Sequence, residues 1–173
     1  MGAHLDLRLR PLRSDDESAA VAAHEEMAAD GFSFLLSYDP DASWDDHLRL
    51  LEDERRGVHR VPGRVRCSFL VADVDGEIVG RASIRHELND HLLVVGGHIG
   101  YGVLSRHRRR GMATEILRQS LVVVRASGVG DVLVTCDDDN VGSARTIERC
   151  GGVLESTVAD PGGGTDVRRY WIR

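Results

Sequence analysis

A basic turn that closes on a glycine stands near the middle of the chain and has the composition of an anion-binding loop. It reads Arg106-His107-Arg108-Arg109-Arg110-Gly111-Met112-Ala113, and apolar residues at helical spacing follow it. The first backbone N–H groups of a helix have no partner inside the helix, and the helix dipole adds partial positive charge there. Such an end binds phosphate, and the small residues Gly111 and Ala113 let a phosphate approach the backbone. The sequence therefore predicts a phosphate-binding turn at the start of a helix.

Two other phosphate-binding motifs do not fit the chain. It contains no lysine, so it has no Walker loop. The glycines between Gly96 and Gly102 lack the spacing of a dinucleotide-binding loop, and no helix is predicted directly after them. The basic turn could instead be only a solvated helix start without a ligand. The predicted elements around the turn help to choose between these two interpretations.

The composition is that of an ordinary globular protein, and it limits the classes of partner. The chain has 173 residues, 42% hydrophobic and 29% charged, which suits one domain over residues 1–173. A formal net charge of −6 argues against general nucleic-acid binding. Cys67, Cys136 and Cys150 lack paired spacing and are expected to be free thiols. Without a membrane-length apolar run or a signal-peptide pattern, a cytoplasmic protein without membrane contact is expected.

Hydrophobic periodicity and turn residues predict the elements that position the basic turn. The predicted strand His98–Leu104 precedes the basic turn, and the predicted helix that opens at Gly111 follows it. Asp75-Gly76 is predicted to be a type I′ hairpin turn, and His59–Arg66 and Asn89–Gly97 are predicted to be connections. The predicted strands are Leu5–Leu12, Ser68–Val74, Glu77–His86, His98–Leu104, Val132–Cys136, Val153–Val158 and Val167–Ile172. The predicted helices open at Ser14, at Ser43, at Gly111 and after Asn140.

The basic turn and the order of the elements resemble the GNAT acetyltransferase superfamily. The turn matches the coenzyme A loop of that family, Arg/Gln-x-x-Gly-x-Gly/Ala, as Arg108-x-x-Gly111-x-Ala113. The resemblance implies an α/β (α+β) fold with a mixed, mostly antiparallel central sheet. Its order is β-α-α-β-β-β-α-β-α-β-β, and its fourth and fifth strands splay apart.

Two further resemblances support the family. The second family motif, Asn-x-x-Ser/Ala followed by Gly, is similar to Asn140, Ser143, Ala144 and Gly151. A bacterial subgroup known only as predicted acetyltransferases is similar over three stretches and supplies no substrate. The three stretches are Ser83–Asn89, Gly97–Gly102 and Val134–Asp137.

The resemblance implies that acetyl-CoA is the co-substrate and lies between the splayed strands. Strand backbone near Val103 would bind the pantetheine amides, and N–H groups of Arg109–Ala113 would bind the pyrophosphate. Arg108–Arg110 would add charge, partly toward the adenosine 3′-phosphate. Asn140 would bind the pantetheine arm or cap the following helix, and these two roles are compatible. The residues expected to bind acetyl-CoA are Val103, Leu104, Arg108, Arg109, Arg110, Gly111, Met112, Ala113, Asn140 and Ser143.

The implied reaction moves an acetyl group from acetyl-CoA to a primary amine, by direct attack in a ternary complex. The family often uses a tyrosine as the acid, at the position that Ile147 occupies here. Glu87 and His98 are candidates for the base and His86 is a third; a strand-end hydrogen-bond network is their alternative role. Because the tyrosine is missing, a non-catalytic acyl-CoA-binding module is the alternative function.

The acceptor is expected to lie near the loop between the first two helices, and a small amine is preferred over a protein. Aromatic residues of this region could line a pocket, and nearby acids could attract a cationic amine; a hydrophobic flap with exposed acids is the alternative. These residues are Phe32, Phe34, Tyr38 and Trp44, with Asp39, Asp41, Asp45 and Asp46. No metal is expected, because the histidines lack ordered ligand spacing. Homodimerisation through the closing strands is a tendency of the family.

Overall fold

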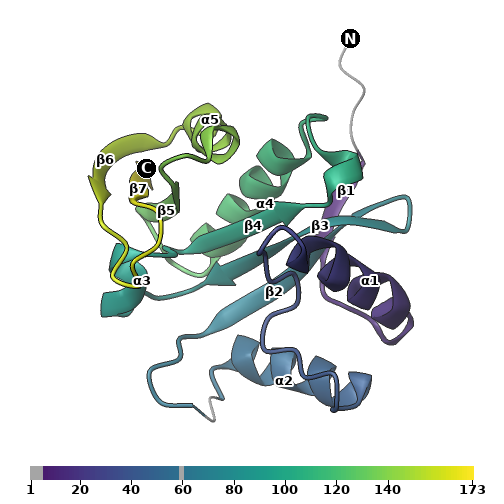
Figure 1. The fold of residues 1–173 in the computed structure, drawn as a ribbon. Helices are drawn as coiled ribbons and strands as arrows, with labels where there is room; N and C mark the ends of the chain where they lie inside the picture. The colour runs from purple at the N-terminus through teal and green to yellow at the C-terminus, as the bar shows by residue number, and fades with distance from the viewer. Residues whose placement is uncertain (1–5, 59–60) are drawn as a thin grey trace.

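Seven strands form two antiparallel sheets in the computed structural model, which describes residues 6–58 and 61–173 (Figure 1). The first sheet has the order β1-β2-β3-β4 and the second has the order β5-β7-β6. The expected α/β architecture is therefore confirmed, with β4 and β5 in different sheets, but the described strands form two antiparallel sheets and not one mixed central sheet. Leu5 of the first predicted strand, and His59 and Arg60 of a predicted loop, lie outside the described residues.

The strands follow the predicted alternation closely. Asp75 and Gly76 both have positive φ, 52° and 86°, as a type I′ turn requires, so the predicted hairpin is confirmed. The strands of the first sheet are β1 Leu7–Arg10, β2 Cys67–Val74, β3 Glu77–Arg85 and β4 Ile99–Val103. Those of the second sheet are β5 Val132–Asp137, β6 Val153–Val158 and β7 Val167–Ile172.

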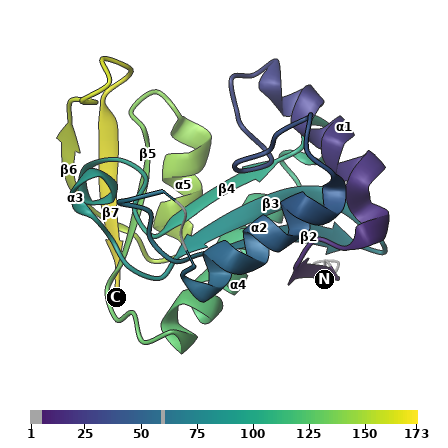
Figure 2. The ribbon, with the colours of Figure 1, turned by 90° about the horizontal axis from the view of Figure 1, so that it is seen from below.

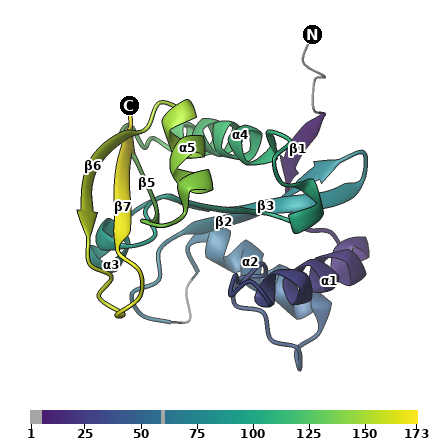
Figure 3. The ribbon, with the colours of Figure 1, turned by 45° about the horizontal axis from the view of Figure 1, so that its top comes forward.

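Helices cover both faces of the first sheet (Figures 2 and 3). α1 and α2 lie on one face, where Phe34, Leu35 and Trp44 join one hydrophobic core. α4 lies on the other face with α5 beside it, and Ile116 and Leu117 belong to the second core. The helices are α1 Glu17–Ala28, α2 Trp44–Arg56, α3 Asp90–Val94, α4 Met112–Ala126 and α5 Val141–Arg149. Within the described residues, no helix is long and apolar enough to cross a membrane.

Two local expectations were wrong. The segment Asn89–Gly97 was expected to be irregular, but it contains α3, because the Asn89 side chain accepts a hydrogen bond from the Leu92 N–H and caps that turn. The first helix was expected to open at Ser14, but a 3-10 turn precedes α1, which begins at Glu17. Neither difference moves the basic turn.

A charged cluster ties the start of α1 to the first sheet. Arg10 on β1 donates to both carboxylate oxygens of Asp16, at 2.6 and 2.9 Å, and to Asp73 on β2 at 2.9 Å. Burial alone would raise the pKa of Asp16, but the hydrogen bonds from Arg10 and from the Arg13 N–H outweigh it, so that the pKa is lowered. The cluster therefore stabilises the fold while its carboxylates are ionised.

The Asp16→Asn substitution is expected to lower the free energy of unfolding at pH 7 by about 1–3 kcal/mol, because Arg10 loses a charged partner. The pKa of Asp16 is lower in the fold than the value of about 3.9 in an unfolded chain. The contribution of Asp16 is therefore complete above that pH and is lost as the pH falls further. Thermal unfolding of both proteins from pH 7 to pH 2.5 should show melting temperatures that converge in acid; a constant difference would contradict this.

Candidate functional site

β4 and β5 meet at one point and then diverge, and His98 forms that point. The His98 N–H donates to the Leu133 carbonyl at 2.7 Å, and the His98 Nδ1 accepts from the Leu133 N–H at 2.9 Å. Gly97 precedes this joint with φ +57°, and a Cβ there would lie 2.5 Å from the Leu133 carbonyl oxygen. A larger residue does not fit so close to the β5 backbone, so glycine is required where the two sheets touch.

The edge of β4 that faces away from β3 has no neighbouring strand among the described elements, although the Val103 carbonyl accepts a hydrogen bond from Arg108. The Leu104 N–H donates to the Val79 carbonyl, and the His98 carbonyl accepts from the Arg85 N–H. Backbone polar groups alternate in direction along an antiparallel strand. The N–H and C=O groups of Ile99, Tyr101 and Val103 therefore point toward the space between β4 and β5. This edge could accept an extended molecule as an added strand.

A cleft of about 1220 Å³ opens beside this edge, between β4, the basic turn and α5. Side chains from the end of α1 close one side of it. The lining includes Met27, Asp30, Gly31, Phe32, Tyr101, Gly102, Val103, His107, Arg108, Arg109, Gly111, Met112, Ala113 and Thr114. It also includes Asp137, Asn140, Val141, Gly142, Ser143, Arg145, Thr146 and Arg149.

The basic turn presents backbone N–H groups to the cleft. Gly111 precedes α4 with φ +82° and no side chain caps the helix there. The Glu115 N–H donates to the Gly111 carbonyl at 3.1 Å. The N–H groups of residues 112–114 come before that bond and are available to an anion. Arg109 also has a positive φ, 61°, which is uncommon for a residue with a side chain and gives the turn its sharp shape.

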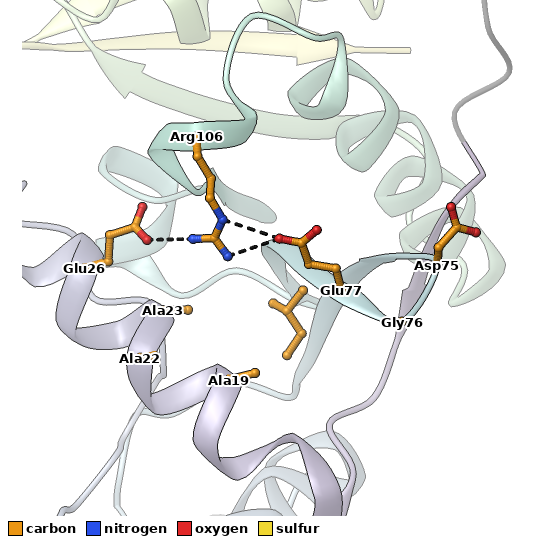
Figure 4. Close-up of a pocket in the computed structure, with 9 residues that line it drawn as sticks. Ala19, Ala22, Ala23, Glu26, Asp75, Gly76, Glu77 and Arg106 are labelled. Carbon is orange, nitrogen blue, oxygen red and sulfur yellow. Dashed lines mark hydrogen bonds and ion pairs between the residues drawn. The ribbon is translucent and has the colours of Figure 1, made fainter.

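Two carboxylates hold the outer side of the turn (Figure 4). Glu26 on α1 accepts from the Ser105 N–H and hydroxyl, and both Glu26 and Glu77 accept from Arg106. Glu26, Glu77 and Arg106 line a second cavity of about 440 Å³ behind the turn. Because Arg106 is already neutralised by two carboxylates, this cavity offers no free positive charge to a ligand.

Other arginines leave positive charge in the cleft. Arg108 donates to the Val103 carbonyl at 3.1 Å and to Asp30 at 2.9 Å, so its guanidinium is engaged. Within the described ranges Arg109 forms no ion pair. Arg145 and Arg149 on α5 also line the cleft, and the sequence analysis missed both. Their spacing of four residues places them on one helix face, which is the signal that could have revealed them.

A polar group of side chains lies where α5 begins. The Asn140 side chain accepts from the Ser143 N–H at 3.0 Å and caps the helix. The Tyr101 hydroxyl lies 2.8 Å from the Ser143 Oγ. Burial raises the pKa of Tyr101, so its phenol stays protonated in the cleft. The sequence could not place this tyrosine; the structure puts its hydroxyl between β4 and α5.

Most residues expected to bind acetyl-CoA lie together. All of them line the cleft except Leu104 and Arg110. Leu104 is buried and its N–H is used by Val79, while Arg110 lies on the exposed side of the turn. The expected cofactor site therefore coincides with the large cleft.

The candidate bases do not line this cleft. Glu87 is exposed beyond the end of β3 and accepts from the Arg66 N–H. His86 contacts the Ser68 hydroxyl at 2.8 Å. His98 forms the joint described above; burial lowers its pKa, and an Nδ1 that accepts an N–H is unprotonated. Each of these side chains takes part in hydrogen bonding at a strand end.

The loop between α1 and α2 contributes only one aromatic side chain to the cleft. Phe32 lines it, whereas Phe34 and Trp44 are buried in the core. Tyr38 packs edge-on against His24 and His47. The acids Asp39, Asp41, Asp45 and Asp46 are exposed and do not line the cleft. In the part of the chain that the structure describes, no group of three or more potential metal ligands gathers.

Comparison with known proteins identifies the same family as the motifs. The family model described as "Acetyltransferase (GNAT) domain" matches residues 6–153. No curated protein sequence matches the chain. Many solved structures share the fold, and three of them illustrate the range.

Mycobacterium smegmatis RimJ in complex with CoA-disulfide has a TM-score of 0.70 and 20% identity, and the match covers 96% of this chain and 81% of RimJ. An N-acetyltransferase from Staphylococcus aureus Mu50 has a TM-score of 0.66 and 17% identity, with coverages of 96% and 98%. The microcin C7 self-immunity acetyltransferase MccE, in complex with acetyl-CoA and AMP, has a TM-score of 0.67 and 17% identity, with coverages of 95% and 91%.

The His98→Asn substitution tests whether His98 connects β4 to β5 through its hydrogen bonds to Leu133 or acts as the catalytic base. The asparagine oxygen can accept the Leu133 N–H, so the variant should fold, whereas His98→Leu should lose about 1–3 kcal/mol for the unsatisfied N–H. An unfolded histidine takes up a proton below about pH 6.5, but folded His98 has a lower pKa and does not. The wild type should therefore lose stability as the pH falls below 6.5, and His98→Asn should lose less.

Thermal melts between pH 8 and pH 4.5 measure this difference, with the exposed His91→Asn as the control. If the N-acetyltransferase activity proposed below is present, a joint predicts a kcat within about threefold of the wild type in His98→Asn, since the cleft geometry is retained. A loss of about a hundredfold or more, with folding intact, would restore His98 as the base.

Proposed function

This chain belongs to the GNAT acetyltransferase family, and on that premise we propose that it is an acetyl-CoA-dependent N-acetyltransferase of a small primary amine. The observation that carries the proposal is the coincidence of two features in one cleft. One is the anion-binding turn at the start of α4, and the other is the unpaired edge of β4. Together they fit a ligand with a charged end and an extended amide chain.

The charged end of acetyl-CoA fits the basic turn. The N–H groups of residues 112–114 would hold the pyrophosphate, and Gly111 leaves the backbone accessible to it. Arg109, Arg145 and Arg149 would supply the opposing charge. The cleft is thus basic in a chain of net charge −6, so that the attraction to a polyanion is local.

The amide chain of the pantetheine arm fits the edge of β4. The backbone groups of Tyr101 and the Val103 N–H point into the cleft and could bond to the arm as a neighbouring strand would, while the Val103 carbonyl accepts from Arg108. Acetyl-CoA supplies a thioester that an amine can attack. A backbone N–H on this edge would then donate to the carbonyl oxygen as it gains negative charge.

Tyr101 is the acid in this proposal and takes the role that Ile147 cannot perform. Ile147 is fully buried in the core, whereas the Tyr101 hydroxyl lies in the cleft beside Ser143. Because burial keeps the phenol protonated, Tyr101 can give its proton to the departing thiolate. The nitrogen–carbon bond forms as the carbon–sulfur bond breaks, and the amine releases its own proton to water.

A non-catalytic acyl-CoA-binding module is the second candidate. It is favoured by the buried Ile147 at the usual acid position and by the absence of Glu87 and His98 from the cleft. Release of free CoA in the presence of amines distinguishes the two candidates, because a binding module would bind acetyl-CoA without consuming it.

The proposals for domain organisation, cellular location and oligomeric state rest on the family resemblance. We propose one acetyltransferase domain over residues 1–173 in the cytoplasm, with homodimerisation through the closing strands. β6 supports the last point, because it is an edge strand whose Val153 and Leu154 are exposed.

Gly111→Glu is expected to abolish binding of acetyl-CoA, since the side chain places a carboxylate where the pyrophosphate belongs. Acetyl-CoA at about a thousandfold over its Kd should stabilise the wild type by roughly 4 kcal/mol. The control is Gly128→Glu, which also replaces a glycine of positive φ but lies at the other end of α4 in open space. Thermal unfolding with and without acetyl-CoA measures the effect; equal shifts in both variants would remove the turn from the site.

Tyr101→Phe is expected to reduce kcat by roughly a hundredfold, the lower range for loss of a general acid. The KM for acetyl-CoA should change little, because the ring is retained. Tyr170→Phe is the matched control, since that phenol is buried and donates to Glu148 outside the cleft. Steady-state release of CoA measures both; an unchanged kcat in Tyr101→Phe would show that the thiolate leaves without Tyr101.

A further inference from the structure

Arg81 is a buried cation and Arg85 a half-buried one, and neither has an acidic partner among the described residues. Both belong to β3 and lie on the face that α1 and α2 cover, where Arg81 is stacked against Phe32 at 4.5 Å. Over residues 6–58 and 61–173, neither guanidinium forms an ion pair with a carboxylate. A buried charge is costly unless it is paired, so this arrangement requires an explanation.

Neutral groups satisfy these guanidiniums only in part. Arg81 donates to the Ser83 hydroxyl at 3.0 Å and to the Ser33 carbonyl at 2.8 Å, and more weakly to the Gly100 carbonyl. Its Nε is buried without any hydrogen-bond partner in the described chain. Arg85 donates through Nη1 alone, to the carbonyls of Gly96 and Gly97. Both arginines therefore keep unused donors.

The positive charge persists near neutral pH. Burial, reinforced by the neighbouring charge of Arg85, lowers the pKa of Arg81 to about 9, which still leaves it protonated. The Cys67 thiol is also close enough to affect Arg81, but burial raises the pKa of that thiol, so it brings no negative charge. The pair thus has a net charge that no described side chain balances.

β4 brings this pair next to the proposed reaction site. A Cβ on Gly100 would lie 3.7 Å from the Arg81 Nη1 and 3.6 Å from the Arg85 Nη1, so both guanidiniums sit over this glycine. Gly100 is the neighbour of Tyr101, whose phenol lies in the cleft. Successive side chains of a strand point to opposite faces. The arginines and the proposed acid therefore lie on opposite faces of β4 at adjacent residues.

The Phe32 side chain lies between Arg81 and the cleft. The Phe32 ring covers the guanidinium and also lines the cleft, and a Cβ on Gly102 would lie 2.7 Å from this ring. Rotation of Phe32 would open a path to Arg81 over Gly100 and Gly102. Gly100 and Gly102 add no side chain to this path, and the Ser83 hydroxyl and the Met27 side chain lie beside it.

We propose that Arg81 and Arg85 bind the carboxylate of the acceptor, so that the acceptor is an amine that also carries a carboxylate, as an amino acid does. The proposal rests on the N-acetyltransferase function above. The carboxylate would occupy the unused donors of both guanidiniums and supply the missing negative charge. Its amine would then lie at the β4 edge, where the thioester is held from the other face.

The test compares each amino acid with its own primary amide as acceptor, for example L-leucine with L-leucinamide and L-phenylalanine with L-phenylalaninamide. CoA release with acetyl-CoA gives kcat/KM for each member of a pair. The wild type should prefer the acid by about tenfold or more, the effect of charge-assisted hydrogen bonds. The ratio should fall toward one in Arg81→Met and Arg85→Met, but not in the exposed control Arg125→Met.

The melting temperature of Arg81→Met distinguishes a role of Arg81 in binding the acceptor from a purely structural role. Replacing an unpaired buried charge by an apolar side chain should leave the melting temperature of Arg81→Met unchanged or raised. If Arg81→Met lowers kcat/KM equally for acids and amides and also lowers the melting temperature, the role of Arg81 is only to hold the Phe32–Ser33 segment. Equal rates with acids and amides in the wild type would overturn the proposal while leaving the N-acetyltransferase function intact.

The carboxylate could instead belong to the acyl donor. Succinyl-CoA and acetyl-CoA are therefore compared with a neutral amine; a preference for succinyl-CoA that depends on Arg81 would overturn the assignment to the acceptor. If no amine is consumed, the carboxylate site can be tested without turnover. The melting temperature of the protein is then measured with N-acetyl-L-leucine and with its amide. Stabilisation by the acid alone, lost in Arg81→Met, supports the carboxylate site, and no shift in the wild type contradicts it.

Discussion

The hydrogen bonds between His98 and Leu133 set the geometry on which the cleft depends. They join β4 to β5 at one residue, after which the two strands belong to different sheets. Because the strands part there, the edge of β4 has no neighbouring strand in the described structure, and of its outward carbonyls that of Val103 accepts from Arg108. A continuous ladder would use the outward backbone groups internally and would fill the space that the ligand needs. The joint and the binding edge are thus two results of the same short contact.

Within residues 6–58 and 61–173, carboxylates neutralise some of the arginines near the cleft and leave others without an ion pair. Carboxylates on α1 and β3 neutralise Arg106, and Asp30 pairs with Arg108. Among the arginines without such partners, Arg109, Arg145 and Arg149 line the cleft, and Arg81 lies under Phe32. An acidic protein can therefore hold two separate anion sites, one formed largely by helix N–H groups and one by side chains. The first suits a large exposed polyanion and the second suits a small buried one.

Much of the fold could be predicted from sequence because its signals are local. The Asp75-Gly76 turn, the strand alternation and the glycine after the arginines each fix a short stretch of backbone. The catalytic candidates could not be found in this way, because their surroundings depend on distant residues. His98 has the composition of a base, but its Nδ1 is taken by Leu133 on another sheet. Tyr101 becomes a candidate only because α5 brings Ser143 to its hydroxyl.

Gly111 precedes α4 without a side chain that could cap the helix. Most helices complete their first turn with a serine, threonine, aspartate or asparagine, as α2 does with Ser43 and α5 does with Asn140. In α4 that role is left to whatever anion enters the cleft, so the ligand completes the secondary structure of the protein. An anion bound in the cleft would therefore protect the amide hydrogens of this turn, which have no partner inside the helix. The rate at which the amide hydrogens of residues 112–114 exchange with solvent is a direct record of the ligand's presence.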